Sequence, residues 1–209
     1  MKLHQMKKIF TDTAYIRTGG SPEELRCAEY LRDRCTDLGL NAWLEDFEVD
    51  MATMEEAQLL IDGKAIPCKG YFNAGSHDLE APLYYLGGTD RYSLSQCKGK
   101  IVLMDGYLGY WKYQDLLDNG AVGFITYSGD IHQPNNDIDQ RELRAMVCEG
   151  KAKLPGVNIN VKDAVSLVHR DAKTAHIVLR QQEYKGKSHN VVAELPGRED
   201  KWIVLSAHY

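Results

Sequence analysis

The sequence predicts an α+β protein in which one segment is inserted into another, and three observations lead to this prediction. A capped amphipathic helix over residues 21–39 is followed by a strand pattern over residues 40–49. Short apolar runs closed by glycine turns come next, and residues 99–127 have the strand, helix, strand order of a β-α-β unit. Two further apolar runs, residues 190–195 and 202–207, then suggest a hairpin.

Composition sets the class of protein before any motif is considered. The 209 residues are 44% hydrophobic, which suffices for the core of one large domain or two small ones. A net charge of −5, with acidic and basic residues interspersed, offers no basic patch for nucleic acid and no polybasic anchor for a membrane. We therefore expect neither partner.

The cysteines and the N-terminal residues indicate the cellular compartment in which the protein is expected. Five scattered cysteines without C-x-x-C spacing indicate neither a disulfide framework nor a zinc knuckle. The first twenty residues lack the apolar run of a signal peptide. We expect reduced thiols in a cytoplasmic protein, or a secreted protein if a leader has been removed.

The helix over residues 21–39 has the most complete local signals. Ser21 is an expected N-cap, Pro22 suits the first helical position, and Glu24 completes a capping box. Leu25, Ala28, Leu31, Cys35 and Leu38 recur at helical spacing, and Gly39 supplies the left-handed stop. The strand that follows carries Trp43, Phe47 and Val49 on one face, which predicts a half-exposed edge strand.

The middle of the chain predicts alternating strands and short helices. Apolar runs at residues 57–61 and 83–86 end at the glycine-containing turns 62–63 and 87–88. Residues 101–104 and 121–127 should form parallel strands joined by a helix that ends near Gly120. Val157, Ile159 and Val161 predict a strand, Asp163 is expected to cap a short helix through His169, and residues 174–180 alternate as another strand.

The last predicted strand is followed by the one histidine for which position argues a function. Residues 202–207 are apolar almost throughout, as in a central strand buried on both faces, so we expect them to belong to a larger domain of which this chain is an N-terminal piece. A histidine at a strand end, such as His208, is well placed to bind a metal, because the sheet fixes its backbone. Without further support, a core or surface role for it would be the better interpretation.

The order SHNVVAELPG, a short charged gap, then WIVLSAHY resembles the opening hairpin of the zinc aminopeptidases of the aminopeptidase Y and glutamate carboxypeptidase type. In that family the histidine begins an H-x-D motif and binds one of two zinc ions. The resemblance implies that His208 is a metal ligand and that the aspartate of the motif would follow Tyr209. It also implies that the helix and strand within residues 1–50 and the hairpin within residues 185–209 belong to one peptidase domain, here incomplete.

Residues 83–179 resemble the protease-associated domain, through CKGKIVLMDG, DLLDNGAVGFITYSG and LPGVNINVKDAVSLV. This resemblance implies a small β-sandwich or open barrel with flanking helices and a β-α-β unit, inserted into the start of the α/β zinc-peptidase domain over residues 51–184. In such peptidases this domain lies over the cleft and influences substrate access, and it contributes no catalytic residue.

The remaining candidates have simpler interpretations. The other histidines singled out have no partner at metal-ligand spacing and are expected at the surface: His77, His132, His169, His176 and His189. Residues 130–150 form a long polar segment, expected to be a mobile surface loop and hypothesised to border the substrate cleft, whereas a calcium site there lacks the EF-hand pattern. No nucleophile elbow and no phosphate-binding loop is present.

The functional hypothesis is therefore the N-terminal part of a zinc-dependent exopeptidase, an aminopeptidase in the first instance, that acts on peptides or proteins with a metal-activated water. The complete enzyme would hold two zinc ions, but this chain should not bind zinc stably or be active without the remainder of the peptidase domain. Two alternatives stay open: a non-enzymatic protease-associated binding module, and a degenerate peptidase homologue. The sequence also leaves open which end of a peptide would be attacked.

Overall fold

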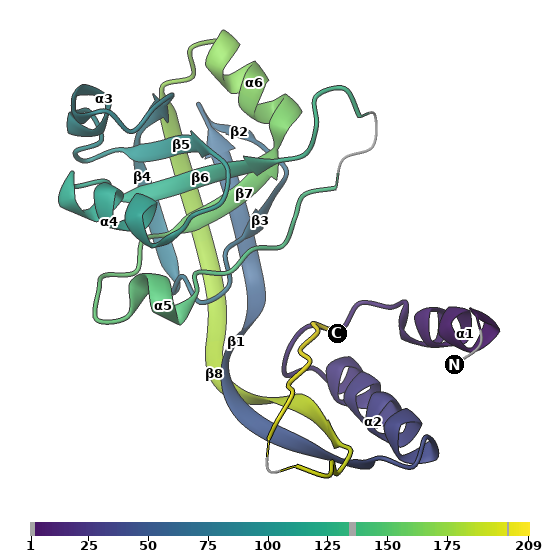
Figure 1. Ribbon diagram of the computed structural model, residues 1–209. Helices are drawn as coiled ribbons and strands as arrows, with labels where there is room; N and C mark the ends of the chain where they lie inside the picture. The colour runs from purple at the N-terminus through teal and green to yellow at the C-terminus, as the bar shows by residue number, and fades with distance from the viewer. Residues whose placement is uncertain (1–2, 134–136, 200) are drawn as a thin grey trace. The chain divides into compact units, whose positions relative to one another are not determined.

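The computed structural model describes residues 3–133, 137–199 and 201–209, which divide into two compact units. One unit comprises Met1–Val49 with Lys185–Tyr209, and the other comprises Asp50–Tyr184. Figure 1 shows the elements of both units. The mixture of helices and strands confirms the predicted combination of the two element types.

The strands described here form one mixed sheet of eight, in the order β2-β1-β8-β4-β5-β6-β7-β3. Strands β4 to β7 run parallel to their neighbours, whereas β8 and β3 pair antiparallel with β4 and β7 at either side. The strands are β1 (Asn41–Ile61), β2 (Lys64–Ala65), β3 (Cys68–Gly70), β4 (His77–Leu86), β5 (Ile101–Asp105), β6 (Gly123–Ser128), β7 (Gly156–Asn160) and β8 (Thr174–Glu194).

The predicted β-α-β unit is confirmed as β5, α4 and β6, with β5 and β6 parallel. Gly120 adopts a positive φ of 70° just after α4, as a glycine stop requires. The helices of the two units are α1 (Leu3–Thr13), α2 (Pro22–Asp37), α3 (Arg91–Ser95), α4 (Tyr110–Asp118), α5 (Ala145–Cys148) and α6 (Val161–His169). None of the helices in the described ranges is both long and apolar enough to cross a bilayer.

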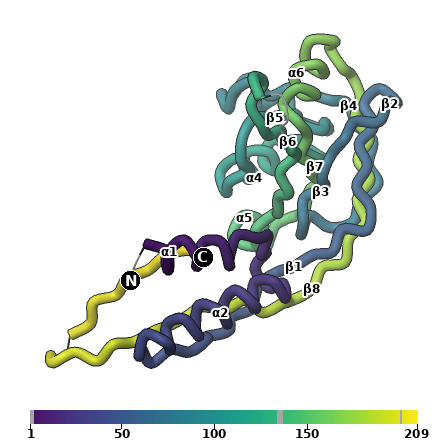
Figure 2. The backbone as a smooth tube through the Cα atoms, turned by 90° about the vertical axis from the view of Figure 1, so that its right-hand side faces the viewer, coloured from purple at the N-terminus to yellow at the C-terminus, as the bar shows by residue number. Residues whose placement is uncertain are grey.

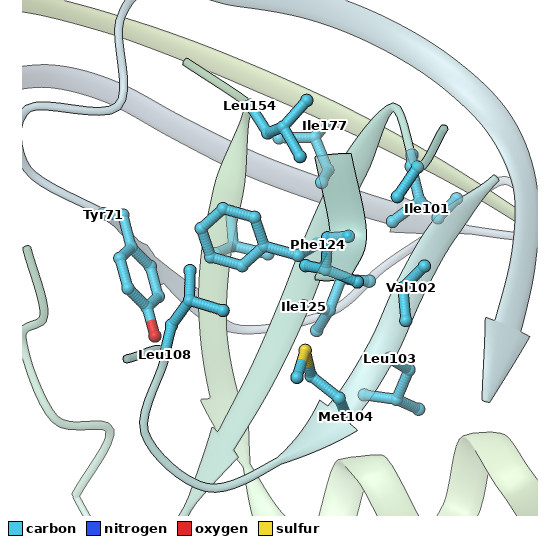
Figure 3. Packing of buried hydrophobic residues seen from close by; sticks show 14 of the residues in the cluster. Tyr71, Ile101, Val102, Leu103, Met104, Leu108, Phe124, Ile125, Leu154 and Ile177 are labelled. Carbon is cyan, nitrogen blue, oxygen red and sulfur yellow. The ribbon is translucent and has the colours of Figure 1, made fainter. Parts of the chain in front are cut away.

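The core of the unit Asp50–Tyr184 lies on both faces of the central parallel strands. Side chains of β5 and β6 are buried almost throughout, which explains the continuous apolar runs in the sequence. The rings of Tyr71 and Phe124 meet edge to face with centroids 4.9 Å apart (Figure 3). Because Phe124 contacts Tyr113 of α4 while Tyr127 lines a pocket with α6, the two helices cover opposite faces of the sheet.

Two predictions for this unit differ from the structure: the cap of the helix through His169, and the assignment of residues 130–150 to a surface loop. Helix α6 begins at Val161, and Asn160 is its N-cap, accepting a hydrogen bond from Lys162 N at 2.9 Å, whereas Asp163 lies in the first turn. The segment 130–150 is not only a surface loop, since Leu143 and Val147 are buried and α5 forms there. Residues 134–136 of this segment lie outside the described residues, and its place beside a substrate cleft stays a prediction.

In the unit formed by Met1–Val49 and Lys185–Tyr209, α2 runs alongside the parts of β1 and β8 that belong to this unit (Figures 1 and 2). Helix α2 and its N-cap Ser21 are confirmed, and Ser21 Oγ accepts a hydrogen bond from Glu24 N at 3.1 Å. The buried side of the helix differs from the predicted stripe. Glu24, Cys27 and Ala28 are buried, whereas Leu25 is 36% and Leu38 68% exposed.

The predicted strand over residues 202–207 does not form in the structure. Residues 190–194 belong to β8, but 202–205 are each at least 74% exposed and pair with no strand among the described residues. A strand is stable only when a neighbour satisfies its backbone N–H and C=O groups, and alternation in a sequence cannot supply that neighbour.

Candidate functional site

His208, the predicted metal ligand, lies on the exposed segment that follows β8. Its imidazole is exposed, and Nδ1 lies 3.1 Å from the backbone oxygen of Tyr209. Nδ1 makes this contact, so Nε2 is the ring nitrogen that does not take part in it.

His208 would supply one ligand of a zinc site. Among the described residues, no three His, Cys, Asp or Glu side chains gather where they could hold a metal ion. A catalytic zinc needs about three protein ligands. The other ligands of a site at His208 would therefore have to come from outside the described residues.

A buried carboxylate lies in the same unit as His208. Glu24, in the first turn of α2, is only 4% exposed. Its Oε2 lies 3.0 Å from His189 Nδ1, and its Oε1 accepts hydrogen bonds from His189 N at 3.2 Å and from the hydroxyl of Tyr209. That hydroxyl also lies 2.7 Å from the backbone oxygen of His189. We call Glu24, His189 and Tyr209 the Glu24 cluster.

Hydrogen bonding determines the charge state of the Glu24 cluster. Burial alone would raise the pKa of the Glu24 carboxyl, but the hydrogen bonds from Tyr209 and His189 outweigh burial and hold the pKa below its usual value. Burial and the bond to Glu24 raise the pKa of the Tyr209 phenol well above its usual range. Glu24 is thus a carboxylate at neutral pH, and Tyr209 is a neutral donor.

Sequence reasoning missed this cluster for two reasons. The predicted capping box forms only in part, because the side chain of Glu24 bonds His189 and Tyr209, while Ser21 N bonds the backbone oxygen of Thr18. His189 was expected at the surface, yet its side chain is only 15% exposed. The sequence does place Glu24 on the same face of the helix as Cys27 and Ala28. A carboxylate buried on that face without a hydrogen-bond partner would destabilise the fold, so its position indicates that a partner exists.

The other histidines have ordinary structural surroundings. His77 Nε2 lies 2.8 Å from the backbone oxygen of Ala74, and His176 pairs with Asp78 across β8 and β4 at 2.7 Å. His132 is exposed near the loop residue Asp130. His132 is thus at the surface, as expected, whereas His77 and His176 are half-buried.

His169 belongs to the one pocket described in the unit Asp50–Tyr184. This pocket, of about 110 Å³, is lined by Tyr85, Tyr127, Ala164, Val165, Val168 and His169. Burial raises the pKa of Tyr127 to about 12, so the phenol stays neutral. The pocket is apolar and does not contain the predicted metal ligand.

This chain is similar to known proteins in its three-dimensional structure. No family model matches the sequence, and a search of curated proteins finds no match either. Among solved structures, an aminopeptidase from Aneurinibacillus sp. strain AM-1 aligns with a TM-score of 0.63 and 22% identity, over 95% of this chain and 49% of that chain.

Two further structures agree with the first. BSAP, a zinc aminopeptidase from Bacillus subtilis, aligns with a TM-score of 0.67 and 22% identity, over 91% of this chain and 46% of its own. A peptidase M28 precursor from Shewanella amazonensis SB2B aligns with a TM-score of 0.64 and 16% identity, over 90% of this chain and 48% of its own. The chain therefore has the fold of about half of each of these proteins.

Proposed function

We propose that this chain is the front part of a zinc-dependent exopeptidase, in the first instance an aminopeptidase that hydrolyses peptides or proteins. The likeness to two aminopeptidase structures, one of them a zinc aminopeptidase, over more than nine-tenths of the chain carries this proposal. Because one fold can serve several functions, the proposal is tied to a particular side chain. That side chain is His208, whose Nε2 is the atom available to a metal.

Each part of the chain has a role in this proposal. His208 binds one of two zinc ions through Nε2, the ring nitrogen that does not contact the Tyr209 backbone oxygen. When bound, zinc polarises the scissile carbonyl and lowers the pKa of the attacking water. The unit Asp50–Tyr184 is a protease-associated domain that influences substrate access. The protein acts in the cytoplasm and needs neither nucleic acid nor a membrane.

The proposal is tested with the full-length protein. We expect a chelator to abolish hydrolysis of an aminoacyl nitroanilide and zinc to restore it. His208→Ala should weaken zinc binding by more than the roughly 10- to 100-fold typical of changes to outer partners of a metal site. The exposed His4 is the matched control, and His4→Ala should leave zinc content and rate unchanged.

Two further measurements bear on the same proposal. Peptides blocked at the amino or at the carboxyl end separate aminopeptidase from carboxypeptidase action. The 209-residue chain by itself should be inactive, because no three potential zinc ligands gather among its described residues. Turnover by the purified chain, or zinc-independent turnover by the full-length protein, would contradict the proposal.

One observation favours a second candidate, a peptide-binding module without catalysis. Tyr107, Tyr110 and Trp111 follow the carboxyl end of β5 and are 52%, 45% and 77% exposed. The Nζ of Lys151 lies 3.7 Å from the centroid of the Tyr110 ring. Exposed aromatic residues flanked by a cation are typical of peptide-contacting surfaces.

This candidate predicts binding in the absence of turnover. An acidic peptide blocked at both ends should bind the wild-type chain, and Trp111→Ala should weaken that binding at least tenfold. The exposed Trp202 is the matched control, since Trp202→Ala changes an aromatic residue of the other unit. Equal affinity of the wild type and Trp111→Ala would exclude this role for the aromatic surface.

A further inference from the structure

The segment that carries His208 has little regular structure of its own. Residues 201–209 form neither helix nor strand, and Trp202 to Leu205 are exposed. A side-chain contact of the next residue, Tyr209, holds this segment within its unit: its hydroxyl donates to Glu24 and lies 2.7 Å from the backbone oxygen of His189. Because neighbouring Cα atoms are about 3.8 Å apart, a residue that is held in place restricts the position of the one beside it.

We infer that Glu24 and His189 are positioning residues for His208, which they hold through the hydroxyl of Tyr209; this inference rests on the proposed function. The Tyr209 hydroxyl donates to the Glu24 carboxylate and lies 2.7 Å from the backbone oxygen of His189, and His208 is the residue directly before Tyr209 in the chain. Neither Glu24 nor His189 binds the metal. They act by fixing the backbone from which the imidazole projects.

Glu24 and His189, which hold Tyr209, both lie in regular secondary structure. Glu24 lies on a regular helix capped by Ser21, and His189 lies within β8, next to the buried Ser188. The carboxylate is desolvated, so loss of one donor leaves a buried acceptor without its full complement of hydrogen bonds. The arrangement therefore favours the docked position of Tyr209 over a position in solvent.

Tyr209→Phe is the most specific variant, because it removes one hydroxyl and keeps the ring. In the full-length protein we expect it to weaken zinc binding about tenfold, the low end of the effect of outer partners of a metal site, because the hydroxyl acts on His208 only through the backbone. Backbone hydrogen exchange over residues 201–209 should become faster. Exchange within the unit Asp50–Tyr184 should not change, since the Glu24 cluster lies in the other unit.

Variants of Glu24 separate positioning from a merely structural role. Glu24→Ala removes the acceptor and should weaken zinc binding as much as Tyr209→Phe does. Glu24→Gln keeps an oxygen that can accept from the Tyr209 hydroxyl, so it should recover most of the affinity. The double variant Glu24→Ala with Tyr209→Phe should lose no more than either single variant, because both break the same contact. Glu23→Ala is the exposed control on the same helical turn.

The outcomes distinguish two failures. If the wild-type full-length protein binds no zinc, the proposed function fails, and this inference fails with it. If the wild type binds zinc and Tyr209→Phe binds it equally well, only the positioning role is overturned. Should Glu24→Ala fail to fold, Tyr209→Phe and Glu24→Gln still decide the question.

Discussion

At the scale of single residues, Gly156 is packed directly against an aromatic ring of the core. A Cβ built on Gly156 would lie 2.0 Å from Cζ of Phe124, a fully buried ring. The φ of Gly156 is not positive, so the backbone conformation does not demand glycine at this position. Glycine is required here because there is no space for a side chain. The ring of Phe124 thus occupies the space that any side chain at position 156 would need.

Gly156→Ala should therefore destabilise the chain by about 1–3 kcal/mol, the usual cost of overpacking a core. Denaturant unfolding of the two proteins at neutral pH measures the difference. Gly88→Ala is the control, because a Cβ there meets its nearest atom at an ordinary 3.6 Å. Combining Gly156→Ala with Phe124→Leu should cost less than the sum of the two single changes. An additive result would mean that the ring is not the obstacle.

At the same scale, the Glu24 cluster shows why the capping box predicted for Ser21 and Glu24 forms only in part. The spacing of Ser21 and Glu24 fits a capping box, and half of that motif forms. The side chain of Glu24 instead bonds a residue 165 positions away, which no local rule could have indicated. The same reason explains why His189 was expected at the surface.

At the scale of elements, the turn between β1 and β2 depends on Asp62. This residue adopts a positive φ of 48°, and its Oδ1 accepts hydrogen bonds from Thr174 N and Lys173 N, each at 3.0 Å. These bonds hold the pKa of the Asp62 carboxyl below its usual value, the bond from Thr174 contributing most. The turn is thereby joined to the start of β8.

This arrangement predicts a pH dependence with a defined sign. A lowered pKa in the folded state means that the charge of Asp62 stabilises the chain above about pH 3.8, its ordinary value, and that this contribution is lost as pH falls through the folded pKa. Asp62→Asn keeps an acceptor and tolerates positive φ, so it should be less stable than wild type at pH 7 and approach it below pH 3.8.

Asp171→Asn is the matched control for Asp62. Asp171 also has a positive φ, of 53°, but its recorded ion pair is with the exposed Lys173. Chemical denaturation of both variants from pH 7 to pH 2.5 makes the comparison. A difference between wild type and Asp62→Asn that stays constant with pH would contradict the role assigned to the charge.

At the scale of the whole molecule, the buried apolar cluster is contained in one unit. Its buried members run from Leu59 to Leu179, all within Asp50–Tyr184. A domain needs its own core to fold alone, and this unit has one. The other unit buries little apolar surface by comparison, since α1 has no buried residue among those described.

Residues 50–184 expressed alone should therefore unfold in one cooperative transition. Thermal and denaturant unfolding followed by circular dichroism test this prediction. Phe124→Ala is the control: it should lower the free energy of unfolding by about 3–5 kcal/mol and shift the midpoint of the transition accordingly. A broad, non-cooperative transition for the isolated segment would show that its core needs the remainder of the chain.

The sequence by itself determined the elements whose signals are local. Ser21 and Pro22 marked the start of α2, Gly120 marked the stop after α4, and the apolar runs identified β5 and β6 as parallel, buried strands. Each of these depends on residues within a few positions of one another, so periodicity and capping suffice to predict it.

Tertiary structure alone decided the rest. It turned Glu24 toward His189 and Tyr209 and left residues 202–205 exposed, although their sequence is that of a buried strand. The first outcome depends on contacts between residues far apart in the chain, and the second on whether a neighbouring strand is present to pair with. A sequence pattern shows that a side chain or a strand needs a partner, but the partner itself is supplied only by the folded chain.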